Sequence, residues 1–138
     1  MDRETLEAAL RNAYAMREAG DVDGAMEIFA PEATYHIMGE QRSCTVVGRH
    51  CGAAARTALE AMCQVFKAIE FRPTSLIIDG NRAVACVRAR FLFVPTGENV
   101  ETEMVHVWTF ADGKCIDVAE YLDTAHIARL HASAQAAA

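Results

Sequence analysis

The chain has 138 residues, of which 52% are hydrophobic and 23% charged, and its net charge is −6 at pH 7. This length suits one domain with one core, and the composition is globular rather than disordered. Lysine and arginine form no basic stripe, so no nucleic-acid partner is expected.

Two helices are predicted at the start of the chain. The first, over residues 2–19, carries five residues at helical spacing: Leu6, Leu10, Ala13, Tyr14 and Arg17. Gly20 follows where this helix should end. A short second helix should contain Met26 and Phe29 and end before Pro31, because the residue that precedes a proline avoids the helical region.

A strand at residues 34–38 and a polar, glycine-bounded loop at residues 39–48 are expected next. A third and longer helix should then begin near His50. Its apolar face is predicted to consist of Leu59, Met62, Cys63, Phe66 and Ile69.

The second half of the chain predicts an antiparallel meander. The expected strands are residues 71–78, 83–94, 100–110 and 114–122. The turns between them contain Asp-Gly-Asn, Pro-Thr-Gly-Glu-Asn and Ala-Asp-Gly, which favour tight reversals. A last helix near residues 124–131 completes an α-α-β-α-β-β-β-β-α order, an α+β layer in one domain over residues 1–132, with residues 133–138 as a frayed tail.

The strand at residues 100–110 is apolar on both sides. Met104, His106 and Trp108 alternate with Val105 and Val107. Helices can cover only one face of the sheet, so a second copy is expected to cover the other. A homodimer through the outer sheet face is therefore predicted.

The charged opening MDRETLE contains no export signal, and no apolar run is long enough to cross a membrane. The five cysteines show no CxxC spacing, and we expect reduced thiols and a cytoplasmic location. His36, Cys44, His50 and Cys51 match no compact zinc pattern, so no metal is predicted. The absence of a GxGxxG or phosphate loop predicts no nucleotide, and no cofactor is expected.

The turn at residues 111–113 decides whether His106 and Glu120 can meet. In a three-residue loop with a bulge, His106 lies opposite Val118 and shares a face with Glu120. A two-residue loop places His106 opposite Ala119 and separates the pair. We favour the shared face.

A histidine and a carboxylate in a closed apolar cavity can form an acid–base pair without a cofactor. Counting across the loop at Pro95 places Arg88 near His106. The alternative is structural: His106 as a hydrogen-bonded core histidine, and Glu120 as the ion-pair partner of Arg88 or Arg90.

Tyr14 and Tyr35 are candidate hydrogen-bond donors to a substrate oxygen. Tyr14 belongs to the apolar face of the first helix, and Tyr35 to the first strand. The alternative is that both are wall residues of the core, with their hydroxyls satisfied by the protein.

Two segments resemble SnoaL-like and ketosteroid-isomerase-like proteins. The first is AGDVDGAMEIFA at residues 19–30, followed by Ala-Thr-Tyr at residues 33–35. The second is WTFADGKCI at residues 108–116, followed by EYLDTA at residues 120–125. The resemblance implies a nuclear transport factor 2-like (cystatin-like) fold, a cone-shaped, curved antiparallel sheet packed on the N-terminal helices.

The resemblance is uneven across this superfamily. Ile37 stands where ketosteroid isomerases have their general-base aspartate, and Arg90 stands where the Arg-x-Asp pair of limonene epoxide hydrolases has its aspartate. SnoaL-like polyketide cyclases fit better. They carry a histidine on the penultimate strand and an acid on the last, which match His106 and Glu120, with glutamate in place of aspartate.

The resulting hypothesis is a small-molecule-binding, SnoaL-like protein that performs cofactor-independent isomerisation or cyclisation of an apolar carbonyl compound. Its expected catalytic residues are Glu120, His106 and Tyr14. The expected substrate-binding residues are Tyr35, Ile37, Arg88, Trp108, Val118, Leu10, Met62 and Phe66. The alternative is a domain of the same fold that binds a ligand without catalysis or serves as a dimeric scaffold.

Overall fold

The computed structural model describes residues 1–41 and 46–137. In chain order its elements are α1 (Arg3–Ala19), α2 (Val22–Met26), β1 (Phe29–Ile37), β2 (Gly48–Cys51), α3 (Ala53–Val65), β3 (Phe66–Asp79), β4 (Arg82–Phe93), β5 (Glu98–Ala111), β6 (Lys114–Leu122) and α4 (Thr124–Ala137). The α+β class and the N-terminal helical layer are confirmed.

Local sequence explains the limits of α1. The carboxylate of Asp2 caps the N-terminus by accepting a 2.8 Å hydrogen bond from the backbone N–H of Thr5. Gly20 ends the helix in the left-handed conformation, with a φ of 76°. The buried face of α1 consists of Leu6, Leu10, Ala13 and Tyr14, as predicted, and α1 packs against β3.

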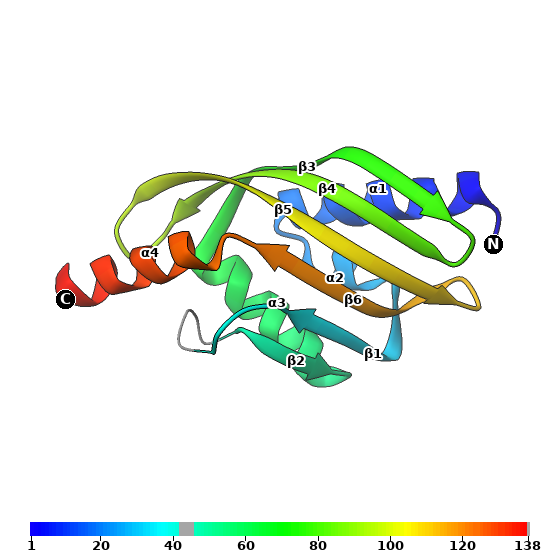
Figure 1. Cartoon of the computed structure of the whole chain (residues 1–138), viewed down its shortest axis with the longest axis horizontal. Coiled ribbons are helices and arrows are strands. Elements are labelled where there is room, and N and C mark those ends of the chain that lie inside the picture. Colours follow the sequence, from blue (N-terminus) through cyan, green and yellow to red (C-terminus); the bar gives the residue numbers. More distant parts are fainter. Residues whose placement is uncertain (42–45, 138) are drawn as a thin grey trace.

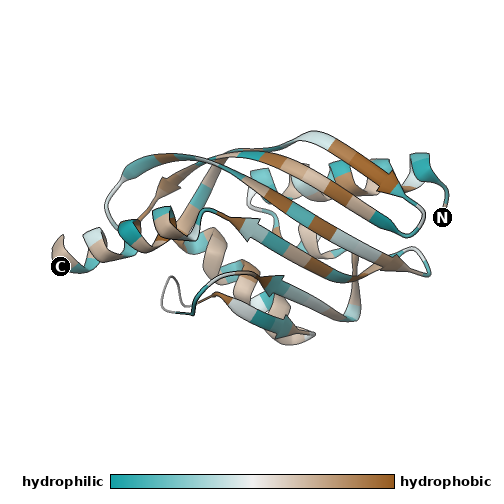
Figure 2. Cartoon of the chain, viewed as in Figure 1, coloured by the Kyte–Doolittle hydropathy of each residue, from teal (hydrophilic) through white to brown (hydrophobic). Residues whose placement is uncertain are grey.

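The sheet is curved and open, with the strand order β2-β1-β6-β5-β4-β3 (Figure 1). Its strands β3 to β6 form the predicted antiparallel meander. The chain then departs from a purely antiparallel sheet, because β1 pairs with β6 in parallel. Hydrophobic and hydrophilic residues alternate along β4 and β5, as expected for strands with one face on a core (Figure 2).

The second helix is shorter than predicted. It ends at Met26, and Phe29 begins β1 instead of continuing the helix. Pro31 lies within β1, in the stretch between Phe29 and Thr34 where the pairing with β6 is irregular. A proline is tolerated there because no regular ladder hydrogen bond requires its missing N–H.

The expected third helix also has different limits. The short strand β2 precedes it and pairs with β1, so the chain is already extended at His50. The helix stops at Val65, and Phe66 and Ile69 belong to β3, where Phe66 pairs with Phe93 of β4. Strand pairing with β4 overrides the helical spacing of these two residues. Residues 42–45 of the predicted loop lie outside the described residues.

The β5–β6 hairpin has a register that neither predicted loop gives. Asp112 and Gly113 form a two-residue turn with φ values of 50° and 77°. A bulge follows on β6, where Ile116 has no partner between the pairs Phe110–Cys115 and Thr109–Asp117. The extra residue shifts the register by one, so His106 lies directly opposite Glu120 and the shared face is confirmed.

The last helix continues through residues 133–137, which were expected to be frayed. Four of the five residues from 134 to 138 are alanine, the strongest helix former. Both ends of the described chain lie far apart, at opposite ends of the molecule (Figure 1). Across residues 1–41 and 46–137, no helix combines the length and the apolar character needed to cross a membrane.

Candidate functional site

A continuous chain of hydrogen bonds joins α1, β1, β5 and β6 beneath the sheet. The Nε1 of Trp108 lies 3.1 Å from the Oη of Tyr14, which lies 2.6 Å from the Nδ1 of His106. The Nε2 of His106 lies 2.8 Å from the Oε1 of Glu120, and the Oη of Tyr35 lies 2.8 Å from the same oxygen. Four separate elements therefore converge on one polar network.

The positions of the protons in this chain follow from Trp108, whose indole N–H can donate a hydrogen bond but cannot accept one. An indole N–H only donates, so the Tyr14 oxygen accepts from Trp108 and its own proton points to the Nδ1 of His106. The Nε2 of His106 then carries a hydrogen and donates it to Glu120. This arrangement places an N–H of His106 against the ionised carboxylate of Glu120.

His106 and Glu120 are the buried polar or charged residues of the described chain, at 3% and 4% exposure. Burial favours a raised pKa for Glu120, but the hydrogen bond and charge of His106, the hydrogen bond from Tyr35 and the charge of Arg17 lower that pKa overall. Burial raises the pKa of both Tyr14 and Tyr35, so both remain protonated donors. The carboxylate is thus held in its charged form inside an apolar interior.

The two oxygens of this carboxylate have different surroundings. Oε1 accepts from His106 and from Tyr35. Oε2 accepts no hydrogen bond from residues 1–41 or 46–137. It is nevertheless not one of the fully buried polar atoms that lack a partner. Glu120 lines a cavity, and Oε2 is the carboxylate oxygen that has no hydrogen-bond partner among residues 1–41 and 46–137.

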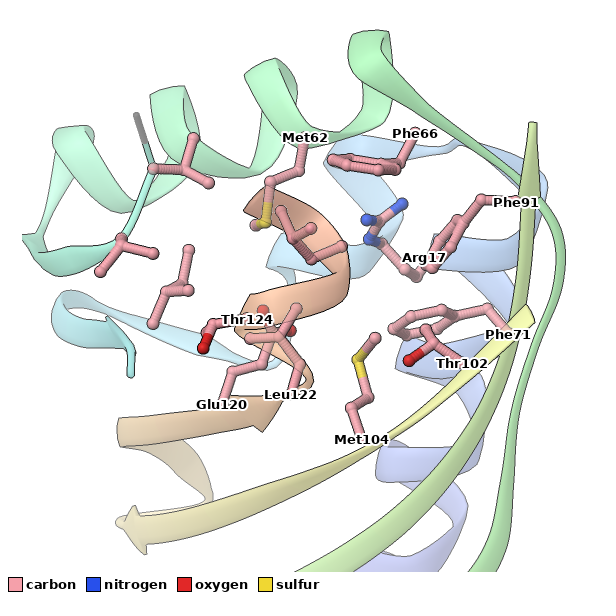
Figure 3. A pocket seen from close by; sticks show the side chains of 14 residues that line it. Arg17, Met62, Phe66, Phe71, Phe91, Thr102, Met104, Glu120, Leu122 and Thr124 are labelled. Carbon is pink, nitrogen blue, oxygen red and sulfur yellow. The ribbon is translucent and has the colours of Figure 1, made fainter. Parts of the chain in front are cut away.

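That cavity, here called the Glu120 cavity, has a volume of about 40 Å³. Figure 3 shows Glu120 and Leu122 on one side and Phe66, Phe71 and Phe91 with Arg17 on the other. Its lining residues are Arg17, Ile37, Val46, Val47, Met62, Phe66, Phe71, Phe91, Thr102, Met104, Glu120, Leu122, Thr124 and Ile127. Such an apolar lining with few polar groups is typical of small-molecule sites.

A second hollow, the Tyr14 cavity, has a volume of about 40 Å³. Its lining residues are Ala13, Tyr14, Arg17, Ala25, Phe29, Tyr35, Leu59, Phe71, His106 and Trp108. Arg17 and Phe71 line both cavities, so these two side chains mark the boundary between them. The hydrogen-bond chain therefore runs from one cavity to the other.

The structure distributes the predicted site residues unequally. Glu120, Ile37, Met62 and Phe66 line the Glu120 cavity. Tyr14, Tyr35, His106 and Trp108 line the Tyr14 cavity. Leu10 and Val118 are buried in the core and line neither cavity, which corrects their assignment as pocket residues.

Arg88 was wrongly placed near His106. Its neighbours Val87 and Ala89 point into the core, so alternation turns Arg88 to the outer face, where it is exposed. There it lies opposite Glu103 in the register of β4 and β5. Ala85 is the residue of β4 that lies opposite His106. The count across the long loop at Pro95 failed because that loop does not fix the register.

Sequence reasoning placed Arg17 on the inner face of the first helix but gave it no role in the site. This residue lies one helical turn after Tyr14 on α1, and an arginine on the apolar side of an amphipathic helix was the available signal. The guanidinium lies 5.0 Å from the centroid of the Phe71 ring, and its Nη1 donates to the Sγ of Cys63 at 3.2 Å. It is the cation that faces Glu120 across the cavity in Figure 3.

Metal ligands do not gather in the described chain: residues 1–41 and 46–137 contain no group of three or more His, Cys, Asp and Glu side chains arranged to hold an ion. Of the residues considered for zinc, Cys44 lies outside the described residues. His50 instead bonds to the backbone oxygen of Val46 at 2.6 Å.

The model of the SnoaL-like domain matches residues 10–118 of this sequence. The chain belongs to the SnoaL-like domain family. The matched segment holds every helix and strand from the greater part of α1 to the first half of β6, and it ends two residues before Glu120. The comparison with curated proteins gave no match.

Solved structures show the same fold as this SnoaL-like domain. An NTF2-like protein of unknown function from Burkholderia pseudomallei K96243 is 23% identical, with a TM-score of 0.80 over 94% of this chain and 98% of the other. TerC, co-crystallised with polyporic acid, is 21% identical, with a TM-score of 0.81 over 91% and 97%. A candidate SnoaL-like polyketide cyclase from Jannaschia sp. CCS1 is 15% identical, with a TM-score of 0.77 over 92% and 94%.

Proposed function

We propose that this SnoaL-like domain binds a small apolar carbonyl compound in the Glu120 cavity and transfers a proton on it without a cofactor. Glu120 is the base, acting through Oε2. The observation that carries the proposal is the asymmetry of this carboxylate, with Oε1 held by His106 and Tyr35 and Oε2 left for the cavity.

In the proposed reaction, Oε2 of Glu120 removes a proton from the carbon next to a substrate carbonyl, and the electron pair of the broken C–H bond moves onto the carbonyl oxygen. Where a C=C bond is conjugated with the enolate, the proton on Glu120 returns to the far carbon of that conjugated system, which is an isomerisation. Alternatively the enolate carbon attacks a second carbonyl of the same molecule and the proton on Glu120 passes to the new alkoxide oxygen, which is an aldol-type cyclisation. Both outcomes return Glu120 to its ionised form.

His106 and the two tyrosines support the base. The Nε2–H of His106 and the hydroxyl of Tyr35 fix the direction of the carboxylate and keep it ionised until substrate binds. Tyr14 holds His106 in the tautomer that can donate to Glu120. We therefore assign Tyr14 an indirect role in place of the expected direct contact with a substrate oxygen.

The apolar walls support a hydrophobic substrate. Met62, Phe66, Ile37 and Phe91 surround the cavity with carbon and sulfur atoms. TerC, whose fold is the same, has been crystallised with polyporic acid, and other proteins with this fold are described as candidate isomerases, a candidate hydroxylase and a candidate polyketide cyclase. The isomerase and cyclase descriptions suit an acid–base site, while the low sequence identity restricts the likeness to the fold.

The test uses α-tetralone, a compact apolar ketone, and follows the exchange of its α-protons in deuterated water by NMR. We expect the wild-type protein to accelerate exchange and Glu120→Gln to reduce that acceleration about a hundredfold or more. Glu103→Gln removes an exposed carboxylate of β5 and serves as the matched control with unchanged exchange. Equal rates for wild type and Glu120→Gln would eliminate Glu120 as the base.

A binding protein without turnover is the second candidate, and one observation favours it: both ring nitrogens of His106 are already engaged inside the protein. In this case α-tetralone would shift the NMR signals of cavity residues, but its α-protons would exchange at the uncatalysed rate. The same titration thus separates the two functions.

We also propose a homodimer through the outer face of the sheet and a cytoplasmic location. Val105 and Val107 are only half-buried there, and Ile77 and Tyr121 are 60% and 47% exposed. A second copy on this face would remove these side chains from water. The cysteines of the described chain, Cys51, Cys63, Cys86 and Cys115, are free thiols, which suits a reducing compartment.

A further inference from the structure

Arg17 is a half-buried cation without a carboxylate partner in residues 1–41 and 46–137. Five other ion pairs of the described chain engage arginines near the surface: Arg11, Arg56 twice, Arg72 and Arg90. Arg17 has instead a thiol and an aromatic face, both weak partners for a guanidinium. Within the described residues, most N–H groups of the Arg17 guanidinium have no hydrogen-bond partner, and the side chain lines a cavity.

The adjacent residue Glu18 does not neutralise Arg17. Its carboxylate does not line the cavity and accepts hydrogen bonds from the backbone N–H of Phe71 and from the side chain of Arg72. Glu120 lines the same cavity as Arg17, but the two charges form no ion pair within 4.0 Å. The opposite charges are held apart, with the cavity between them.

We propose that Arg17 anchors an anionic group of the ligand, so that the substrate class is an apolar oxo acid rather than a neutral ketone. This inference rests on the proposed function of the Glu120 cavity. A guanidinium presents a planar fork of N–H donors that matches the two oxygens of a carboxylate. Repulsion by Glu120 directs the acid group of such a ligand to the Arg17 side and its reacting carbon to Oε2.

The aromatic wall fits this orientation. Phe66, Phe71 and Phe91 lie beside Arg17 in Figure 3, and Phe71 already packs under the guanidinium. A ligand whose acid group reaches Arg17 would lay its apolar part along these rings. The remaining polar groups of the lining, Thr102 and Thr124, are hydroxyls and carry no charge to oppose an anion.

The test compares hydrocinnamate with hydrocinnamamide, which have the same size but differ in charge, by NMR titration of the whole chain. We expect wild type to bind hydrocinnamate about tenfold or more tightly than the amide, because a hydrogen bond to a charged group is stronger than a neutral one. Arg17→Gln should abolish the preference and leave the affinity for the amide unchanged. Arg88→Gln removes an exposed arginine of β4 and should keep the full preference.

Three further readouts decide the outcome. Glu120→Gln, which removes the opposing charge, should strengthen hydrocinnamate binding and not that of the amide. Unfolding curves of Arg17→Gln identify a loss that comes from the fold, and Arg17→Lys should restore part of the preference if charge matters. Equal affinity of wild type for both probes would overturn the inference and leave proton transfer intact, whereas failure of both probes to shift cavity signals would count against the ligand cavity and the inference together.

Discussion

Glu120 carries an ionised carboxylate at a depth where charge is costly. Burial acts against ionisation, while His106, Tyr35 and Arg17 act in favour of it and outweigh burial. A group whose pKa is lower in the folded than in the unfolded state stabilises the fold above its unfolded pKa, and this contribution is lost as the pH falls through the folded pKa. The direction of the pKa shift at Glu120 can therefore be read from the way the free energy of unfolding changes with pH.

We predict that wild type loses stability relative to Glu120→Gln as the pH falls from neutral to about pH 3, with the change confined to the region below the ordinary glutamate pKa of 4.5. Urea unfolding at a series of pH values measures both proteins. If burial prevailed instead, wild type would gain relative stability on acidification, starting above this pKa. The difference in free energy of unfolding between wild type and Glu120→Gln therefore changes with pH in opposite directions, depending on whether the pKa of Glu120 is lowered or raised.

The sequence predicted which residues belong to the site better than it predicted which of them meet in space. The pairing of His106 with Glu120 was accessible because both belong to strands with clear alternation on either side of a short turn. Arg17 was not identified, since its role depends on packing between α1 and β3, which are separated by more than forty residues of chain. The position of Arg88 depended on a long loop, and counting residues there gave the wrong face.

Among the elements, the β5–β6 hairpin controls the site. Its turn keeps Asp112 and Gly113 at positive φ, and the bulge at Ile116 brings Glu120 opposite His106. The glycine and aspartate of this turn were recognised from sequence. The bulge was expected within the loop and lies at Ile116 instead, because an unpaired residue in a strand leaves no local signature. The strand β2 was missed for a similar reason, since it is short and depends on pairing with β1.

We predict that Gly113→Ala lowers the free energy of unfolding by about 1 kcal/mol. An added Cβ would meet only Met1 at 3.7 Å, an ordinary contact, so the cost comes from the left-handed backbone alone. Asp112→Asn is the matched control, because asparagine tolerates positive φ and should change stability by only a few tenths of a kcal/mol. Urea denaturation measures both, and an unchanged Gly113→Ala protein would show that the turn relaxes to another conformation.

At the scale of the whole molecule, the helices cover one face of the sheet and the other remains partly apolar. The surface is centred on Val105 and Val107 of β5 and bordered by Ile77, Ile116 and Tyr121. The α+β class and the location of the sheet's inner face could be read from the alternation of residues, because that pattern is local. What covers the outer face depends on how chains associate, which no local pattern records, and we test it separately.

We predict that the wild-type chain sediments as a dimer and that Val107→Lys sediments as a monomer, because it would bury an unpaired charge in each half of the interface. Gln64→Lys adds the same charge to an exposed position of α3, on the helical side, and should remain dimeric. Sedimentation velocity distinguishes the species. A wild-type monomer at all accessible concentrations would contradict the proposed interface.

Trp108 is the one tryptophan of the sequence. Its indole donates to Tyr14, and its ring lies 6.1 Å from that of His106, measured between centroids. Intrinsic fluorescence excited at the indole band therefore comes from a single chromophore inside the polar network. Protonation of the imidazole or rearrangement of the tyrosine should alter that emission, so occupancy of the cavities can be followed optically in the unlabelled protein.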